Sequence, residues 1–386
     1  MICEQGEASM IGIISDDLTG CGDVGLHFAD RGLRTIVYVS NSERLSEDLK
    51  PDVDWDVLVV NTESRFDDPQ TAYEKVKRVL RFFRKLNIER IYKKIDSTLR
   101  GNIGSEIDAL FDELNIEKLP FCAAFPRTGR ITIEGYHYVR RELVTRTEFA
   151  RDPRNRVNEA HIPTLLKETS RYSERIKVYN AKTQRDLENI AREITDYATV
   201  CGASGLAGEL VKYWGKAGLS RDVKSKTVTG GPKPVLIVSG SVQSVTYEQI
   251  EKLKGRKGLL AVPIDFERDR VEIPDAENAK HILIYPQESI YKPDAEKIIR
   301  TLVYLTTGLC KGGFFRNLIL IGGDTAFNIC QALKIDTFQI ISSVSPGIAF
   351  CRTLDGKYNF ILKPGGLGYK ETLIRCLQFF ERSRSS

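Results

Sequence analysis

Two adjacent aspartates, Asp16 and Asp17, follow an apolar run near the start of the chain, within the segment SDDLTG. In open α/β sheets, ligands bind at the carboxyl ends of the strands. Two neighbouring carboxylates at such a place are costly unless a proton, a cation or a hydrogen-bond network compensates them. One of them could accept hydrogen bonds from substrate hydroxyls or act as a general base. Capping the following helix would need only one aspartate, so the pair favours a functional site.

The segment KIDSTLRGNIG, residues 94–104, is the most informative stretch of the chain. It leads from a predicted strand into a predicted helix, whose N-terminus carries partial positive charge and free N–H groups. With Lys94 and Arg100 beside that terminus, the segment predicts an anion site. Asp96 and Ser97 could form hydrogen bonds with sugar hydroxyls. The structural alternative is that a hydroxyl residue of this segment simply caps the helix.

Further basic residues follow other apolar runs where strands are predicted to end. Arg65 closes the segment NTESR, and its guanidinium could clamp a carboxylate through two parallel hydrogen bonds. The alternative for Arg65 is an ordinary solvated surface residue. Arg127 and Arg130 follow a fifth apolar run and could add positive potential to the same site. His137 stands alone nearby, and a lone histidine is more often structural than catalytic.

The second half of the chain carries glycine-rich turns at the ends of three predicted strands. One such turn is ordinary after a strand, but three together predict a nucleotide site, because glycine lets backbone N–H groups approach phosphates closely. No G-x-x-x-x-G-K-[ST] segment occurs, which excludes a P-loop protein. An aspartate in the second turn could hold Mg²⁺ directly or through water. The candidate nucleotide-binding residues are Ser239, Gly240, Gly322, Gly323, Asp324, Thr325, Gly365 and Gly366, and Asp324 is also the candidate metal ligand.

Gly20, Gly22 and Gly25 also match the G-x-G-x-x-G fingerprint of dinucleotide-binding proteins. We disfavour a NAD site here, because the intervening residues DDLT keep the first glycine from making the tight turn off the strand. The two aspartates would also repel a pyrophosphate. An NAD-dependent oxidoreductase of a small hydroxy acid stays an alternative function.

Short apolar runs alternate with helical patterns along most of the chain. Strands are predicted at residues 10–15, 34–39, 57–61, 90–95, 120–125, 235–239, 318–321 and 360–363. Helices are predicted at residues 104–114, 247–253, 327–333 and 371–380, and a hairpin or excursion at residues 131–138. This alternation predicts two α/β domains with largely parallel sheets covered by helices. The polar segment 220–234, rich in glycine and proline, is the predicted linker between domains 1–225 and 226–386.

Composition limits the function classes. The chain has 386 residues, of which 41% are hydrophobic and 28% charged, which is typical of a globular protein. No apolar run is long enough for a bilayer, and the N-terminal residues lack the pattern of a signal peptide. The net charge of +5 comes without a long basic block, so we expect neither nucleic acid nor a membrane as partner. Eight widely spaced cysteines without a CxxC pair indicate buried thiols in the cytoplasm.

Together these motifs resemble the four-carbon acid sugar kinase family, whose members phosphorylate threonate, erythronate or 3-oxo-tetronate with ATP. The resemblance rests on SDDLTG (residues 15–20), KIDSTLRGNIG (94–104), SGS (239–241), GGDTAF (322–327) and KPGGLG (363–368). It extends in order over nearly the whole chain. It implies an N-terminal acid-sugar domain, a C-terminal nucleotide domain and an active site in the cleft between them.

Carried over by motif, the resemblance implies a small anionic sugar-acid substrate, ATP and Mg²⁺. Its implied substrate contacts are Asp16, Asp17, Arg65, Lys94, Ile95, Asp96, Ser97 and Arg100, with Asp17 and Asp96 as the catalytic residues. The resemblance implies phosphorylation of a terminal hydroxyl, and a homodimer is compatible with it. A non-catalytic acid-sugar sensor that uses only the N-terminal half is the second alternative. It would bind acid without ATP, and three intact glycine turns speak against it.

Overall fold

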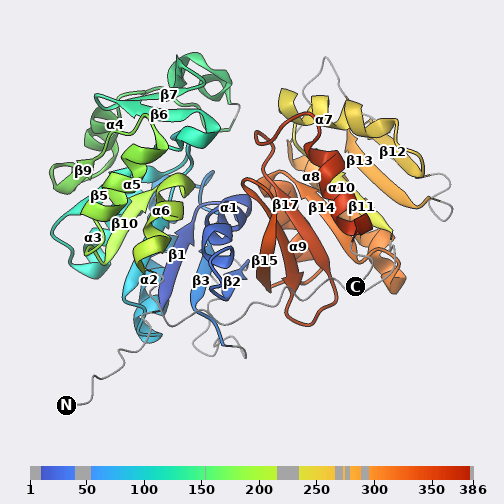
Figure 1. Ribbon diagram of the computed structural model, residues 1–386, viewed down its shortest axis with the longest axis horizontal. Helices are drawn as coiled ribbons and strands as arrows, with labels where there is room; N and C mark the ends of the chain where they lie inside the picture. Colours follow the sequence, from blue (N-terminus) through green and yellow to red (C-terminus); the bar gives the residue numbers. More distant parts are fainter. Residues whose placement is uncertain are drawn as a thin grey trace. The chain divides into compact units, whose positions relative to one another are not determined.

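The computed structural model describes residues 10–39, 54–152, 154–214, 234–265, 273, 279–287 and 295–382. The chain divides into two compact units, Met1–Asp222 and Val223–Ser386 (Figure 1). The predicted linker, residues 220–234, lies outside the described residues except for Pro234. Apart from Cys3, which also lies outside them, the cysteines are all free and buried.

The main sheet of unit 1 is parallel, as predicted, and its described strands follow the order β2-β3-β1-β4-β10-β5-β9. Nearly every strand residue is buried, because helices cover both faces, and such strands read as continuous apolar runs. The strands are β1 (Ile11–Ser15), β2 (Thr35–Tyr38), β3 (Val57–Asn61), β4 (Arg90–Lys94), β5 (Leu119–Cys122), β9 (Ile176–Val178) and β10 (Thr199–Gly202).

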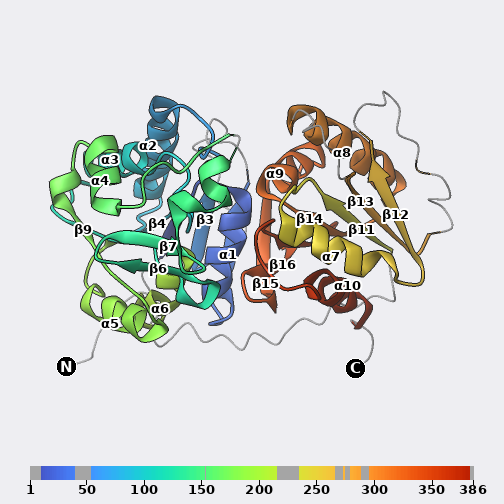
Figure 2. The same cartoon turned by 90° about the horizontal axis from the view of Figure 1, so that it is seen from above.

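Figure 2 shows the helices of unit 1 on the two sides of this sheet. On one side α1 packs against α6, and α6 against α5; on the other α2 packs against α3, and α3 against α4. A separate antiparallel sheet follows β5 and includes the predicted hairpin. The helices are α1 (Leu18–Ala29), α2 (Pro69–Lys85), α3 (Ile103–Leu114), α4 (Ile162–Thr169), α5 (Gln184–Glu193) and α6 (Ser204–Trp214), and the small sheet comprises β6 (Arg130–Ile133), β7 (Tyr136–Val139) and β8 (Glu142–Leu143).

Helix α2 illustrates how the sequence specifies these elements. Asp68 caps its N-terminus by accepting hydrogen bonds from the backbone N–H groups of residues 70 and 71, and Pro69 occupies the first turn. Val76, Leu80 and Phe83 recur at helical spacing and are buried, whereas the basic residues between them face solvent. This apolar stripe packs into the core that also holds the side chains of β1, β3 and β4.

Unit 2 has its own sheet, in which the described strands follow the order β12-β13-β11-β14-β17-β16-β15. It is parallel from β12 to β17, and β16 and β15 are added antiparallel. Figure 2 shows α8 and α9 on one side of this sheet and α7 and α10 on the other. The elements are β11 (Val235–Ser239), α7 (Ser244–Lys254), β12 (Leu259–Ile264), β13 (His281–Pro286), α8 (Ala295–Cys310), β14 (Asn317–Ile321), α9 (Gly323–Ala332), β15 (Thr337–Ser345), β16 (Ile348–Thr353), β17 (Asn359–Lys363) and α10 (Thr372–Arg382).

Short 3₁₀ helices complete the described secondary structure, at Pro126–Thr128, Val144–Arg146, Glu148–Arg151 and Ser173–Arg175 in unit 1 and Lys311–Gly313 in unit 2. None of the helices in the described part of the chain combines the length and the apolar character that a bilayer span requires.

Candidate active site

The polar segments predicted for the substrate meet at one edge of the unit 1 sheet. Ser15, the last residue of β1, is in register with Asn61 at the end of β3 and with Lys94 at the end of β4. The segments that follow these three strands therefore emerge side by side. They carry the aspartate pair, Arg65 and the KIDSTLR turn, so the predicted substrate residues come together from three separate parts of the sequence.

The aspartate pair binds Arg65. Nε and Nη2 of Arg65 donate to the two carboxylate oxygens of Asp16 at 2.8 and 2.9 Å, and Nη2 also donates to Oδ1 of Asp17 at 2.7 Å. Burial alone would raise the pKa of Asp16, but the guanidinium outweighs it and the pKa lies below its ordinary value. Arg65 was predicted as a clamp for the substrate carboxylate. In this structure its fork is engaged by the protein's own carboxylates.

Asp17 also caps the N-terminus of α1. Its Oδ1 accepts a hydrogen bond from the backbone N–H of Gly20 at 3.0 Å, and its Oδ2 accepts one from the Thr19 hydroxyl at 2.6 Å. Asp17 is thus the helix cap, and Asp16 is the aspartate that capping does not explain. The structural interpretation therefore accounts for Asp17, and a functional role of the pair stays a prediction.

Asp96 and Arg100 form the second network, within the turn that joins β4 to α3. Oδ2 of Asp96 accepts hydrogen bonds from Nε of Arg100 at 2.7 Å and from the Thr98 hydroxyl. Arg100 also binds Asp152, with Nη1 3.1 Å from Oδ2. Burial would raise the pKa of Asp96, but Arg100 and Arg65 hold it well below its ordinary value. Asp96 therefore stays ionised as a hydrogen-bond acceptor.

The backbone of this turn is held in an unusual conformation. Leu99 has φ +64° and Gly101 has φ +99°, both in the left-handed region. A Cβ atom at Gly101 would lie 3.1 Å from Oδ2 of Asp16, so only glycine fits without strain beside the aspartate pair. Asn102 ties the turn to the neighbouring loop, since its amide donates to the carbonyls of Ser64 and Asp67 at 2.9 Å each. Strain of this kind persists at sites that the surrounding structure over-determines.

His137 supports the turn from β7. Its Nε2 lies 2.9 Å from the carbonyl oxygen of Ser97, and its Nδ1 lies 3.0 Å from the hydroxyl of Thr132. A carbonyl can only accept, so Nε2 carries the proton and Nδ1 accepts from the hydroxyl. Burial lowers the pKa of His137 to about 4, which keeps the ring neutral. His137 positions the backbone at Ser97, in agreement with the structural role expected of a lone histidine.

Two lysines end β4, and they differ in their partners. Lys93 is fully buried and pairs with Glu106 of α3, with Nζ 2.8 Å from Oε2. The hydroxyl of Ser64 also donates to Glu106, which links β4, α3 and the β3 loop beneath the site. Lys94 is buried too, but its Nζ donates to the Ile95 carbonyl at 2.8 Å and it makes no ion pair among the described residues. Its charge is therefore available to an anion.

Sequence reasoning missed Asp23, on α1. Its Oδ1 is buried and has no hydrogen-bond partner within the described ranges. Burial raises the pKa of Asp23 to about 6, although the nearby charge of Lys94 opposes the shift. The residue stands inside the glycine fingerprint, which drew attention to the glycines instead. Those glycines lie within α1 and not at a turn off a strand, so they do not form a dinucleotide-binding turn.

In unit 2 the three glycine turns also lie at neighbouring strand ends. Ser239 of β11 is in register with Ile321 of β14, and Ile321 with Lys363 of β17. The backbone N–H of Gly240 donates to Ile321, and that of Gly322 to Lys363, so the turns are joined to one another. Gly322 has φ +102° and precedes α9 without a side-chain cap, which leaves the helix N-terminus suited to a phosphate.

The third turn rests on side chains of α7 and β17. Thr246 donates to the carbonyl of Gly365 at 2.8 Å, and Lys363 donates to the Pro364 carbonyl at 2.9 Å. Burial lowers the pKa of Lys363 to about 8. Gly366 faces open space, because a Cβ atom there would meet nothing within 4 Å. A phosphate can therefore approach its backbone.

Two of the predicted nucleotide-binding residues, Ser239 and Asp324, have different surroundings. The hydroxyl of Ser239 is fully buried and has no partner among the described residues, so it lies behind the turn surface. Asp324 lies in the first turn of α9 beside the buried Thr325. The described residues hold no group of three or more His, Cys, Asp or Glu that could bind a metal by themselves. The side chain of Asp324 is a carboxylate, which is the kind of oxygen ligand that Mg²⁺ prefers.

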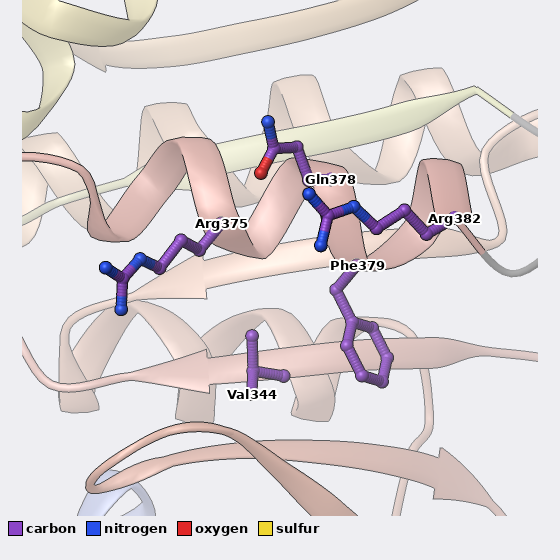
Figure 3. Close-up of a pocket in the computed structure, with 5 residues that line it drawn as sticks. All are labelled: Val344, Arg375, Gln378, Phe379 and Arg382. Carbon is purple, nitrogen blue, oxygen red and sulfur yellow. The ribbon is translucent and has the colours of Figure 1, made fainter.

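Unit 2 also contains a cavity of about 340 Å³ between β15 and α10. Figure 3 shows its lining, with Val344 on β15 and the other side chains on α10. Arg375 and Arg382 border it, and both are exposed. Solvated arginines do not make a built anion site, and none of the predicted nucleotide residues lines this cavity.

Comparison with known proteins agrees with the division of the chain. A family model described as a sugar-binding N-terminal domain matches residues 11–177, and a nucleotide-binding C-terminal domain matches residues 236–373. The crystal structure of a Haemophilus influenzae protein covers 96% of this chain and 100% of its own with a TM-score of 0.73, at 22% identity, which shows the shared fold. The chain therefore combines a sugar-binding and a nucleotide-binding α/β domain.

Two full-length relatives give the family. A D-threonate kinase from Bordetella bronchiseptica is 30% identical over 97% of this chain and 98% of its own length. A D-erythronate kinase from Heliobacterium modesticaldum is 28% identical over 96% of this chain and 97% of its own. The chain belongs to the four-carbon acid sugar kinase family, and the prediction of an ATP-dependent kinase is confirmed.

Proposed function

We propose that this protein transfers the γ-phosphoryl group of ATP to a terminal hydroxyl of a four-carbon acid sugar of the threonate, erythronate or 3-oxo-tetronate class. The observation that supports this most directly is the full-length similarity to a D-threonate kinase. In this proposal residues 1–225 bind the acid and residues 226–386 bind the nucleotide. The free, buried cysteines are compatible with a reducing compartment, and we propose a cytoplasmic location.

The acid would lie at the edge of the unit 1 sheet where β1, β3 and β4 end. Lys94 supplies an unpaired positive charge there, and the Ile95–Ser97 backbone and the Ser97 hydroxyl supply polar contacts. Oδ1 of Asp96 makes only a long contact of 3.4 Å with Nη2 of Arg100, so it can accept a hydrogen bond from a substrate hydroxyl. Arg100 keeps Asp96 in place, as Arg65 keeps Asp16 and Asp17 in place.

Asp17 and Asp96 are the proposed catalytic residues. Phosphoryl transfer proceeds through a loose transition state in which the acceptor hydroxyl attacks roughly in line with the leaving group. Little of its O–H bond has broken at that point, so a strong base is not required. A carboxylate that stays ionised and accepts the hydroxyl hydrogen bond orients the nucleophile. The low pKa of Asp96 suits that role.

The nucleotide phosphates would lie on the turns of unit 2. Backbone N–H groups of Gly323, Thr325 and Gly366 are the proposed donors, and the N-terminus of α9 adds partial positive charge. Gly240 would shape the first turn, because its own N–H binds the Ile321 carbonyl. Asp324 is the proposed protein ligand of Mg²⁺, which neutralises phosphate charge when bound. Ser239 supports the turn from behind.

The test is ADP release from Mg-ATP with D- and L-threonate, D- and L-erythronate and 3-oxo-tetronate as acceptors. Turnover with one acid is expected and would identify the substrate. Acid binding without ATP binding would instead favour a sensor. Protection of the fold by NAD, and not by ATP, would favour an oxidoreductase.

A further inference from the structure

A substrate carboxylate needs a positive partner, and the two arginines expected to supply it are already paired. Arg65 is bound by Asp16 and Asp17, and Arg100 by Asp96 and Asp152. If either arginine released its carboxylates to bind a ligand, those buried carboxylates would be left without partners, which is costly. Lys94 offers a single point charge but not the planar fork that fits a carboxylate.

Arg130, the first residue of β6, is a buried arginine of unit 1 to which the described residues supply no carboxylate partner. Its side chain is buried, with the residue only 5% exposed. Nη1 donates to the carbonyl of Thr128, but Nε is buried and has no acceptor, and the guanidinium makes no ion pair within the described part of the chain. Burial lowers the pKa of Arg130, while the negative charge of Asp96 acts in the other direction without outweighing burial. The guanidinium therefore lacks the compensation that Arg65 and Arg100 have.

The hairpin places Arg130 toward the turn after β4. Arg130 and Thr132 alternate with less buried residues along β6, so their side chains lie on the same face of the strand. Thr132 on that face hydrogen-bonds His137, and His137 hydrogen-bonds the carbonyl of Ser97. The face that carries Arg130 is thus the face that contacts the substrate turn.

We propose that Arg130 binds the carboxylate of the acid substrate through its Nε–Nη2 edge, with Arg65 and Arg100 acting as positioning residues. This inference rests on the proposed function. The Nε–Nη2 edge is the one that carboxylates engage through two parallel hydrogen bonds, and Nη1 is held away from it by Thr128. Burial of an uncompensated guanidinium lowers stability, and such a cost is expected where a ligand supplies the missing partner.

The test compares Arg130→Met and Arg130→Lys with Arg185→Met, which removes an exposed arginine of α5. Binding of D-threonate and D-erythronate, and of the uncharged polyols threitol and erythritol, is measured by calorimetry without nucleotide. We expect Arg130→Met to bind the acid about 10- to 100-fold more weakly, as loss of a charge-assisted pair implies. The polyol affinity of Arg130→Met and the acid affinity of Arg185→Met should stay within about threefold of the wild-type values. Arg130→Lys is intermediate, because it keeps the charge and loses the fork.

Thermal unfolding gives a second readout. The Tm of Arg130→Met without ligand should equal or exceed that of the wild type, because a buried, unpaired charge is removed. A lower Tm, or equal losses for acid and polyol, would mean a structural role and overturn the inference. Acid binding by Arg130→Met as tight as that of Arg185→Met would overturn it as well.

The outcomes separate this inference from the proposed function. Wild-type protein that binds one acid but shows no ADP release refutes the kinase proposal for that acid, and the variants still decide the role of Arg130. Wild-type protein that binds none of the acids overturns both.

Discussion

Arg65 and Asp16 form a bidentate pair, with Nε–Oδ2 and Nη2–Oδ1 distances of 2.8 and 2.9 Å, across segments that are far apart in the sequence. Both side chains are at most 10% exposed. The pair joins the end of β1 to the loop after β3, and its charges compensate each other away from water. It is a structural element of the site before any ligand arrives.

Replacing Arg65 with Gln should therefore cost stability as well as activity. Two adjacent buried carboxylates would lose their cation, and removal of one partner of a buried pair costs about 3–5 kcal/mol. Urea unfolding measures the loss. Arg81→Gln is the control and should lose less than about 1 kcal/mol, because Arg81 is exposed and its partner Glu113 also pairs with Lys77 and Arg84. Equal losses in the two variants would contradict the importance of the Arg65 pair.

The buried pair of Lys93 and Glu106 allows a double-mutant test. Lys93→Met leaves an uncompensated carboxylate under the site and should destabilise by about 3–5 kcal/mol. Adding Glu106→Leu removes that carboxylate, so the double variant should recover most of the loss. Unfolding free energies of the four proteins give the coupling. A double variant whose loss equals the sum of the single losses would show that the two charges do not depend on each other.

Lys363 predicts a pH effect in unit 2. Its pKa falls from 10.5 to about 8 in the folded protein, because burial disfavours the ammonium. Between those values the unfolded chain holds more protons, so stability should rise with pH across this window. The rise should be up to about 3 kcal/mol and absent from Lys363→Met. Unfolding of both proteins from pH 7 to pH 10.5 tests this, and parallel curves would contradict it.

The raised pKa of Asp23 predicts that stability changes with pH in the opposite direction in the acid range. Its pKa rises from 3.8 to about 6 on folding, so the folded protein holds the extra proton between these values. Stability should fall as pH rises through this window, by up to about 3 kcal/mol, and then stay level. Asp23→Asn should lack this fall and be more stable than the wild type at neutral pH. The comparison uses chemical unfolding from pH 4 to pH 7, and a variant with the wild-type slope would show that burial does not raise the pKa of Asp23.

The sequence predicted many of the strands whose residues are buried on both faces, although β10 and β13, which are also buried throughout, were not predicted. The strand expected at residues 57–61 is β3 with the same bounds, and the one at 235–239 is β11. Continuous apolar runs of this kind give a clear signal. The antiparallel strands β15 and β16 were not predicted, because half of β15 is only partly buried and its pattern is mixed.

The sequence indicated which residues lie together at the strand ends, but not which of them form ion pairs with one another. Their position at strand ends indicated Asp16, Arg65 and Asp96 as candidate site residues. Nothing in the neighbouring sequence, however, indicates that Arg65 pairs with Asp16 and not with a ligand. Such a pairing depends on the register of β1 with β3, which is a tertiary property. Arg130 was noticed only as a source of potential, because its lack of a partner is visible only once its surroundings are known.

Asp17 gives the most direct test of the proposed chemistry. Asn is as good a helix cap as Asp, so Asp17→Asn should keep the cap of α1 and the fold, while losing the negative charge that orients the acceptor hydroxyl. We expect kcat to fall by about 10²–10⁴-fold, the range for loss of an acid–base group. Asp68→Asn is the matched control, because Asp68 caps the N-terminus of α2 and is exposed. It should keep wild-type kcat. Full activity of Asp17→Asn, with its fold intact by circular dichroism, would remove Asp17 from the mechanism and leave Asp96 as the proposed orienting carboxylate.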